Sequence, residues 1–210
     1  HRIINRKKTK EIKVGKISVG GNSQISVHPE HYFKCKKYYN TNIECFGSFF
    51  NHILDFYFGL FVDLEKYMGC LGNFYDSKFM SGFYIVNPPY VKDDIFKSLD
   101  HILNILNSSN ESLSFLFVIP AWKYGDREKL NKKCKKKLEL KFKGSYDETL
   151  NLIKKSKYLT KYLLYCSENF KFYSYLREKS VNVAPVNLIL LSNTKTNFNI
   201  EGIFGKHDIL

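Results

Sequence analysis

Short, mostly apolar runs alternate along the chain with longer stretches in which apolar residues recur every three or four positions. Such runs are typical of strands in a buried sheet, and the periodic stretches are typical of amphipathic helices. Strands are predicted at 43–46, 82–86, 113–119, 170–175 and 186–191, and helices at 29–40, 49–61, 95–106 and 147–166. This alternation predicts an α/β fold with a mixed, mostly parallel sheet and helices on both faces.

The strand at 82–86 is followed at once by Asn87-Pro88-Pro89-Tyr90. The two prolines cannot donate hydrogen bonds to a sheet, and each fixes its φ angle, so the chain is expected to leave the sheet at Asn87 in a stiff loop. The strand at 113–119 ends in a comparable way at Pro120-Ala121-Trp122. Both carboxyl ends are expected on one side of the sheet, where open α/β sheets bind their ligands.

This loop suits methylation of a planar exocyclic amine such as adenine N6, a poor nucleophile because its lone pair is delocalised into the ring. The side-chain oxygen of Asn87 and the carbonyl oxygen of Pro88 are both acceptors and could orient the two amino hydrogens. Pro89 would stiffen the loop, and Tyr90 would offer a flat face to a flipped base. The alternative interpretation is a Pro-Pro turn without chemistry.

Charge and composition limit the classes of partner that the protein is expected to bind. The 210 residues carry a formal net charge of +13, almost all of it from lysine, which favours a polyanion such as nucleic acid. Lysine-rich codon usage is the competing explanation. The five cysteines show no zinc-ligand spacing and are expected to be reduced thiols, so no metal is predicted. No apolar run is long enough to span a membrane, and an intracellular location, nuclear or cytoplasmic, is expected.

A larger set of residues resembles one family. The set comprises Cys45-Phe46-Gly47-Ser48-Phe49-Phe50-Asn51, Asp63, Tyr67-Met68-Gly69-Cys70-Leu71-Gly72, Asp76, Ser81-Gly82, Asn87-Pro88-Pro89-Tyr90 and 113–122. It is similar to the cap-specific adenosine N6-methyltransferases related to the phosphorylated-CTD-interacting factor (CAPAM), over about half of the chain. The resemblance implies a class I, Rossmann-like methyltransferase that uses S-adenosyl-L-methionine. The implied substrate is the adenosine beside the 7-methylguanosine cap of mRNA, and the implied product is m6A or m6Am.

The resemblance also assigns site residues. Catalysis is expected from Asn87, Pro88, Pro89 and Tyr90, and cofactor binding from Phe46, Gly47, Ser48, Asn51, Asp63 and Asp76. Substrate contacts are expected from Trp122, Lys123, Lys132 and Lys133. Residues 1–42 are interpreted as a basic extension or lead-in helices, and residues 43–210 as the methyltransferase domain.

Other functions stay open at this point. The tetrapeptide also occurs in enzymes that methylate adenine in DNA or glutamine in proteins, and an adenosine inside an RNA is a further possible target. The positive charge argues against a protein substrate but not against DNA. A binding subunit that keeps the fold without activity is the remaining alternative.

Overall fold

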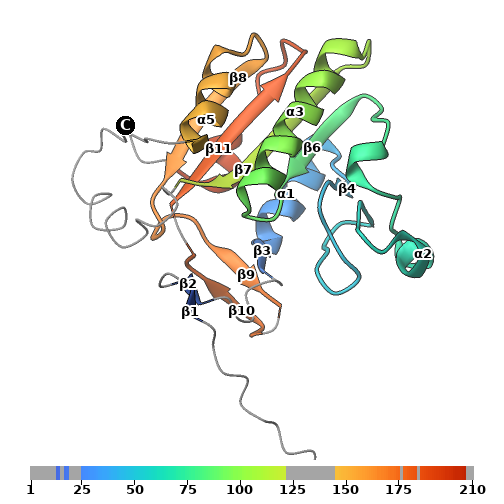
Figure 1. Cartoon of the computed structure of the whole chain (residues 1–210), viewed down its shortest axis with the longest axis vertical. Helices are drawn as coiled ribbons and strands as arrows, with labels where there is room; N and C mark the ends of the chain where they lie inside the picture. The colour runs from blue at the N-terminus through green and yellow to red at the C-terminus, as the bar shows by residue number, and fades with distance from the viewer. Residues whose placement is uncertain are drawn as a thin grey trace, which may run out of the picture.

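A computed structural model describes residues 13–14, 17–18, 25–121 and 145–206, apart from residues 176 and 184. Within these ranges six strands form the main sheet, in the order β5-β4-β6-β7-β11-β8 (Figure 1). The strands are β4 (Ile43–Glu44), β5 (Phe56–Tyr57), β6 (Gly82–Val86), β7 (Leu113–Pro120), β8 (Leu159–Tyr165) and β11 (Val186–Ser192).

The sheet is mixed and mostly parallel, as the sequence predicts. Strand β4 runs parallel to β5 and β6, and β6 runs parallel to β7. Strand β11 is antiparallel to both β7 and β8, so it alone is reversed within the described sheet. Beyond β5, Tyr57 forms a parallel bridge with Cys70, which extends the sheet by one short segment. The carboxyl ends of β4, β6 and β7 therefore meet at one edge.

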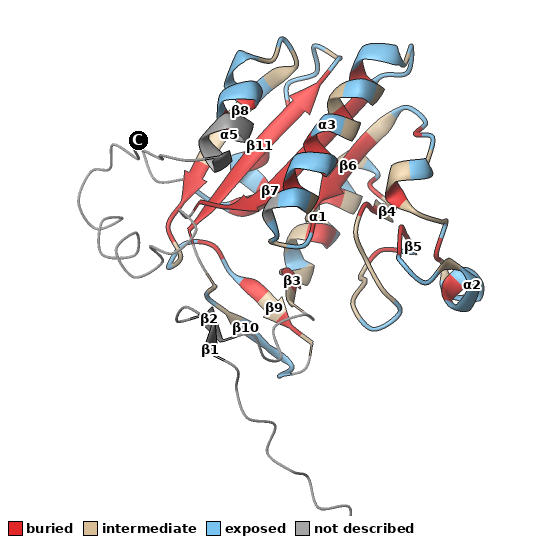
Figure 2. Ribbon diagram, viewed as in Figure 1, coloured by how far each residue is buried: buried red, intermediate tan, exposed pale blue. Residues whose placement is uncertain are grey.

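Helices cover both faces of the sheet, each over its own apolar core (Figure 2). Helices α1 (Pro29–Tyr39) and α6 (Ile200–Phe204) pack on one face, against residues such as Ile85 and Leu188. Helices α3 (Lys92–Ser108) and α5 (Ser145–Lys155) pack on the other, against Phe115 and Ile189. The long apolar strands fit this arrangement because every residue of β7 and β11 is buried.

Two smaller sheets and three further short helical segments lie outside the main sheet in the described residues. A three-stranded sheet in the order β10-β9-β3 is formed by β3 (Ile25–Val27), β9 (Phe172–Ser174) and β10 (Lys179–Val181). Strands β1 (Lys13–Val14) and β2 (Ile17–Ser18) pair antiparallel. Helix α2 (Val62–Glu65) leads into the 3-10 turn η1 (Lys66–Met68), and a second such turn, η2 (Phe74–Asp76), precedes β6.

The helix predicted over 49–61 is wrong. This segment forms a folded loop and then strand β5, although its apolar spacing looks helical. The backbone N–H groups of Ile53 and Leu54 are held by the Glu44 carboxylate, and Tyr57 donates to Gly69 O at 3.1 Å. Distant partners thus take the hydrogen bonds that a helix would have formed internally.

Two other boundaries also differ. The helix predicted over 147–166 ends at Lys155, because the residues of β8 pair with β11 instead. Helix α3 begins at Lys92, three residues before the predicted start, and its N-cap residue, Val91, makes no side-chain cap hydrogen bond. The predictions of strands at 82–86, 113–119 and 186–191 are confirmed.

Candidate active site

The Asn-Pro-Pro-Tyr segment leaves the sheet directly after β6, as predicted. The Tyr90 hydroxyl donates to Asn87 Oδ1 at 2.9 Å, and Val91 N donates to Pro89 O at 2.7 Å, which closes a tight turn. Pro88 is buried and Pro89 exposed, while Asn87 and Tyr90 are half-buried. The Tyr90 ring lies edge-on to Phe172 of β9, with 6.0 Å between the ring centroids. Both ends of the segment are therefore fixed.

A second loop, residues 47–54, follows β4 at the same edge of the sheet. Ser48 and Asn51 exchange two backbone hydrogen bonds, and His52 Nδ1 lies 2.9 Å from Ser48 O. Gly47 sits so close to Tyr57 that an added Cβ atom would lie 2.8 Å from Tyr57 Cβ. Only glycine fits this position without a shift of β5. The loop is thus a rigid neighbour of the Asn-Pro-Pro-Tyr segment.

Glu44, the last residue of β4, holds this loop through hydrogen bonds to its backbone. Its Oε1 atom accepts the N–H groups of Ile53 and Leu54, while its Oε2 atom is buried and has no hydrogen-bond partner in the described structure. Burial raises the pKa of this carboxyl to about 7, against the backbone N–H groups of Ile53 and Leu54 and the Tyr32 phenol, which all lower it. The phenols of Tyr32 and Tyr175 lie close enough for Glu44 to raise their pKa values in turn, after burial itself.

Unpartnered polar atoms gather around the loop. Besides Glu44 Oε2, Ser48 Oγ and Asn51 Oδ1 are buried without a hydrogen-bond partner in the described structure. Buried polar groups are normally satisfied, so such a set fits a ligand with ammonium and hydroxyl donors. Ser48 and Asn51 were predicted as cofactor residues and Glu44 was not. An acid inside an otherwise apolar strand was the signal that could have identified it.

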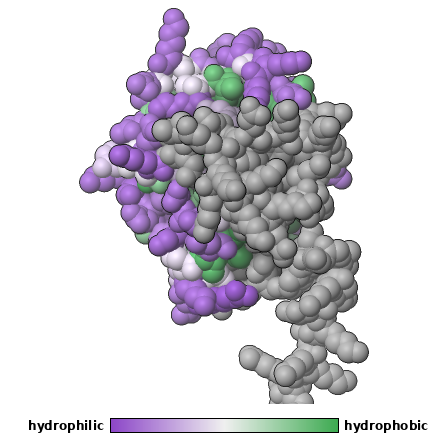
Figure 3. Space-filling view, turned by 90° about the vertical axis from the view of Figure 1, so that its left-hand side faces the viewer, coloured by the Kyte–Doolittle hydropathy of each residue, from purple (hydrophilic) through white to green (hydrophobic). Residues whose placement is uncertain are grey.

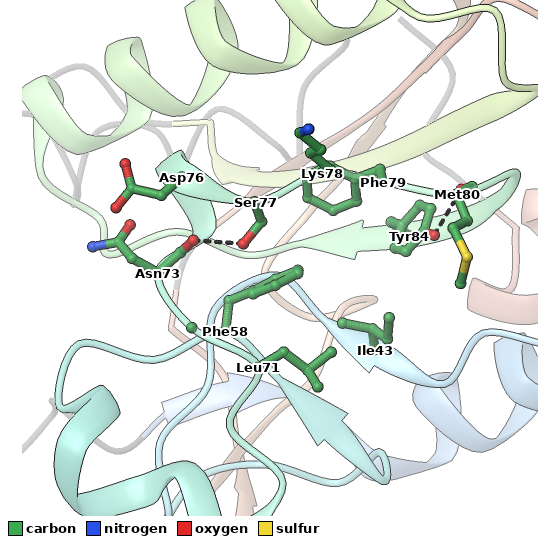
Figure 4. A pocket seen from close by; sticks show the side chains of 11 residues that line it. Ile43, Phe58, Leu71, Asn73, Asp76, Ser77, Lys78, Phe79, Met80 and Tyr84 are labelled. Atoms are coloured by element: carbon green, nitrogen blue, oxygen red, sulfur yellow. Dashed lines mark hydrogen bonds between the residues drawn. The ribbon is translucent and has the colours of Figure 1, made fainter.

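The remaining predicted cofactor residues are more dispersed. The Phe46 ring packs on Phe74 of η2, with 4.7 Å between the centroids. Asp63 is exposed on α2, and Asp76 is exposed at the end of η2. Asp76 lines a cavity of about 430 Å³ with Asn73, Ser77 and Lys78 over a floor that includes Phe58 (Figure 4). None of Asn87, Phe46, Gly47, Ser48 or Asn51 lines that cavity.

The predicted substrate residues Trp122, Lys123, Lys132 and Lys133 lie outside the described residues. On the face seen in Figure 3, the residues that the structure describes are mainly hydrophilic, with small apolar patches between them. Among the described helices, none combines the length and apolar character needed to cross a membrane. The described cysteines Cys35, Cys45, Cys70 and Cys166 are buried.

The chain is also similar in sequence to known proteins. A family model described as "Phosphorylated CTD interacting factor 1 WW domain" matches residues 7–160. The human and mouse proteins named mRNA (2'-O-methyladenosine-N(6)-)-methyltransferase are each 32% identical to the chain over 96 residues. That match covers 45% of the chain and 14% of the length of each relative. The family match extends over most of the chain, and the resemblance found in the sequence is confirmed: the protein belongs to the phosphorylated CTD interacting factor 1 family.

Proposed function

We propose that the chain is a class I methyltransferase domain that transfers a methyl group from S-adenosyl-L-methionine to adenine N6 in RNA. The observation that carries the proposal is the Asn-Pro-Pro-Tyr segment, fixed at the carboxyl end of β6 beside the loop of residues 47–54. The sheet order, with a single reversed strand near one edge, supports the fold assignment. The names of the two relatives support the choice of reaction.

In this mechanism the protein orients the amine. Asn87 Oδ1 and the Pro88 carbonyl oxygen accept the two N6 hydrogens, which favours a tetrahedral nitrogen with an available lone pair. S-adenosyl-L-methionine, when bound, would supply a methyl group on a sulfonium sulfur, and the amine nitrogen would bond to that methyl carbon as the C–S bond breaks and a neutral thioether leaves. The extra proton on N6 then leaves to solvent. Asn87 need not act as a base, because the pKa of an N-alkylated anilinium-like nitrogen is low.

The cofactor site that we propose is the loop after β4. The carboxylate of Glu44 would hold the cofactor's ammonium group through its unpartnered Oε2 atom, and Ser48 and Asn51 would contribute polar contacts. Gly47 keeps the backbone close to β5, and Phe46 closes the side next to η2. Asp63 and Asp76 remain candidates for the ribose hydroxyls, although both are exposed and neither contacts this loop through a hydrogen bond in the described structure.

The substrate that we propose is the first transcribed adenosine of a 7-methylguanosine-capped mRNA. The net charge of +13 fits a polyanionic partner, and the relatives are named for an mRNA nucleoside. Trp122, Lys123, Lys132 and Lys133 follow β7, whose carboxyl end lies beside that of β6. They are proposed as contacts to the cap or to its phosphates.

The deciding experiment is transfer of a tritiated methyl group onto capped RNA, uncapped RNA and duplex DNA, followed by nucleoside analysis. The expected product is N6-methylated adenosine from capped RNA. Asn87→Ala should lower the turnover about a hundredfold or more while leaving cofactor affinity nearly unchanged. Asn104→Ala, an exposed site on α3, is the matched control. Near-normal turnover of Asn87→Ala would exclude the mechanism. If methylated product formed only on duplex DNA, the substrate would be DNA and not RNA.

A further inference from the structure

The loop of residues 47–54 presents two adjacent aromatic rings to solvent. Phe49 is 42% exposed and Phe50 is 72% exposed, and their ring centroids are 4.8 Å apart in an edge-to-face arrangement. Exposed apolar side chains that lie together, rather than singly, can mark a binding surface. The two rings are therefore a candidate binding surface, which we call the Phe49–Phe50 platform.

The strand register places the platform beside the proposed catalytic segment. Glu44 of β4 lies opposite Ile85 of β6, and the two strands are parallel. Both strands end at the same edge of the sheet within a few residues of this pair, and β4 continues into the loop that carries the platform while β6 continues into Asn87. A nucleotide next to an adenine held at Asn87 would thus lie within reach of the two rings.

The platform is held rigidly from several sides. Phe49 N donates to Glu65 Oε1 at 3.2 Å, and the backbones of Ser48 and Asn51 are hydrogen-bonded to each other. At the end of the loop, Asp55 forms an ion pair with Lys36 of α1 at 2.5 Å. Preorganisation of this kind lowers the entropic cost of binding at an aromatic surface.

The charge of the loop favours a nucleic acid over a protein partner. Residues 45–54 contain no acidic side chain, and the carboxylate of Asp55 is already paired with Lys36. Nothing in the loop itself would repel a phosphate backbone, and the chain as a whole is strongly basic. Exposed aromatic rings beside such a surface are the usual means of holding unpaired bases.

We propose that the Phe49–Phe50 platform stacks an unpaired base of the RNA substrate next to the target adenosine. This inference rests on the proposed function, because it takes RNA as the substrate. Phe50 is the more exposed ring and would carry most of the stacking, while Phe49 supports it edge-on. The stacked base is recognised by its flat face, so the platform would hold the strand without reading its sequence.

The test measures binding without methyl transfer. Oligoribonucleotides carrying 2-aminopurine at single positions are titrated with the protein, and both anisotropy and 2-aminopurine fluorescence are recorded. Phe50→Leu should weaken RNA binding about fivefold to a hundredfold, as expected for loss of one stacked base, and should abolish fluorescence quenching at one position. Phe50→Tyr and Phe50→Trp keep a flat ring and should bind within about twofold of wild type.

Phe33→Leu is the matched control, because Phe33 is 58% exposed and stands on α1 rather than in the loop. If Phe50→Leu binds RNA as tightly as wild type, or if Phe50→Tyr loses as much as Phe50→Leu, the platform does not stack a base. Loss of S-adenosyl-L-methionine affinity in Phe50→Leu, measured by calorimetry, would also overturn the proposal, because the ring would then serve the cofactor.

The two proposals can fail separately. If wild-type protein binds the labelled RNA and quenches its fluorescence but transfers no methyl group, the proposed reaction is wrong and the proposal for the platform is unaffected. Protein that methylates RNA while Phe50→Leu behaves as wild type would leave the reaction and remove the platform.

Discussion

The hydroxyl of Tyr90 donates a hydrogen bond to Asn87 Oδ1 at 2.9 Å, so the last residue of the Asn-Pro-Pro-Tyr segment holds the side chain of the first. The contact fixes which side of the Asn87 amide presents oxygen. An amide oxygen has two lone pairs, and the second stays available for a substrate hydrogen. Tyr90 therefore has two proposed tasks, which are to orient Asn87 through its hydroxyl and to offer its ring to the base.

Tyr90→Phe separates these two tasks, since it removes the hydroxyl and keeps the ring. The lost hydrogen bond should lower kcat about twofold to tenfold with little change in KM, because a typical bond of this kind contributes about 1 kcal/mol. Tyr90→Ala should lower kcat further. Steady-state kinetics on capped RNA provide the measurement, with Tyr38→Phe on the exposed side of α1 as the control. An unchanged kcat in Tyr90→Phe would show that the hydroxyl does not position Asn87.

The lysine run that follows β7 lies outside the described residues, but its role can be tested by salt dependence. If Lys132, Lys133, Lys135, Lys136 and Lys137 contact phosphates, replacing them with Gln should weaken binding to all RNA sequences alike. The slope of log affinity against log salt should shrink by roughly 0.7 to 0.9 for each lost contact. Exposed lysines at the end of α5, Lys154 and Lys155, serve as controls. An unchanged slope would identify the run as a solvated surface.

Cap recognition is tested by competition. A 7-methylguanine ring is flat and cationic, and aromatic side chains bind such rings well. Trp122 stands two residues after the end of β7, so Trp122→Ala should reduce the use of capped RNA. Wild-type protein is given 7-methylguanosine-capped RNA together with the same RNA bearing an unmethylated cap or a bare triphosphate. Preference for the methylated cap is expected, and equal rates on all three would remove cap recognition without affecting adenine methylation.

The central strands could be predicted because their own residues determine their burial. All eight residues of β7 are buried, and a run that is apolar apart from Ser114 is the direct sign of this environment. The Asn-Pro-Pro-Tyr segment could be predicted equally well, because two consecutive prolines cannot donate the hydrogen bonds that would continue β6. For these parts the local sequence and the final environment agree.

The loop after β4 could not be predicted in this way. Its apolar spacing indicates a helix, yet Phe50, Leu60 and Phe61 are exposed, so the pattern does not report a buried face. The actual structure depends on Glu44, which accepts hydrogen bonds from residues nine and ten positions later. Glu44 stands out in the sequence as an acid in an apolar strand, but its role in holding the loop could not be predicted, because Ile53 and Leu54 reach it only once the loop has folded back.

The close approach of Gly47 to Tyr57 makes a stability prediction. In Gly47→Ala the new Cβ would lie 2.8 Å from Tyr57 Cβ, and the neighbour is the base of a buried side chain. Overpacking of this kind should lower the free energy of unfolding by about 1–3 kcal/mol. Gly82→Ala in β6 is the control, because its nearest contact would be an ordinary 3.4 Å. Equal melting temperatures for the two variants would contradict the close packing of this loop.

Glu44 should make both stability and cofactor binding depend on pH. Its pKa is raised from 4.5 in the unfolded chain to about 7 in the fold, so the fold favours the neutral carboxyl. The associated stability is complete below pH 4.5 and is lost as the pH rises to about 7, at a cost of up to about 3 kcal/mol. Glu44→Gln keeps an acceptor for Ile53 and Leu54 but does not titrate. As the pH rises from 4.5 to about 7, the free energy of unfolding of Glu44→Gln, measured by urea unfolding, should therefore increase relative to that of wild type.

The affinity for the cofactor should depend on pH in the opposite direction to stability. An ammonium group needs the charged carboxylate, so the affinity of wild-type protein for S-adenosyl-L-methionine should rise as the pH increases through about 7. Glu44→Gln should bind more weakly and lack this rise. Other titrating groups, including the neighbouring Tyr32 and Tyr175, are present in both proteins, so the difference between the two curves reports Glu44. Parallel curves in calorimetry at several pH values would show that Glu44 supports the loop alone and does not contact the cofactor.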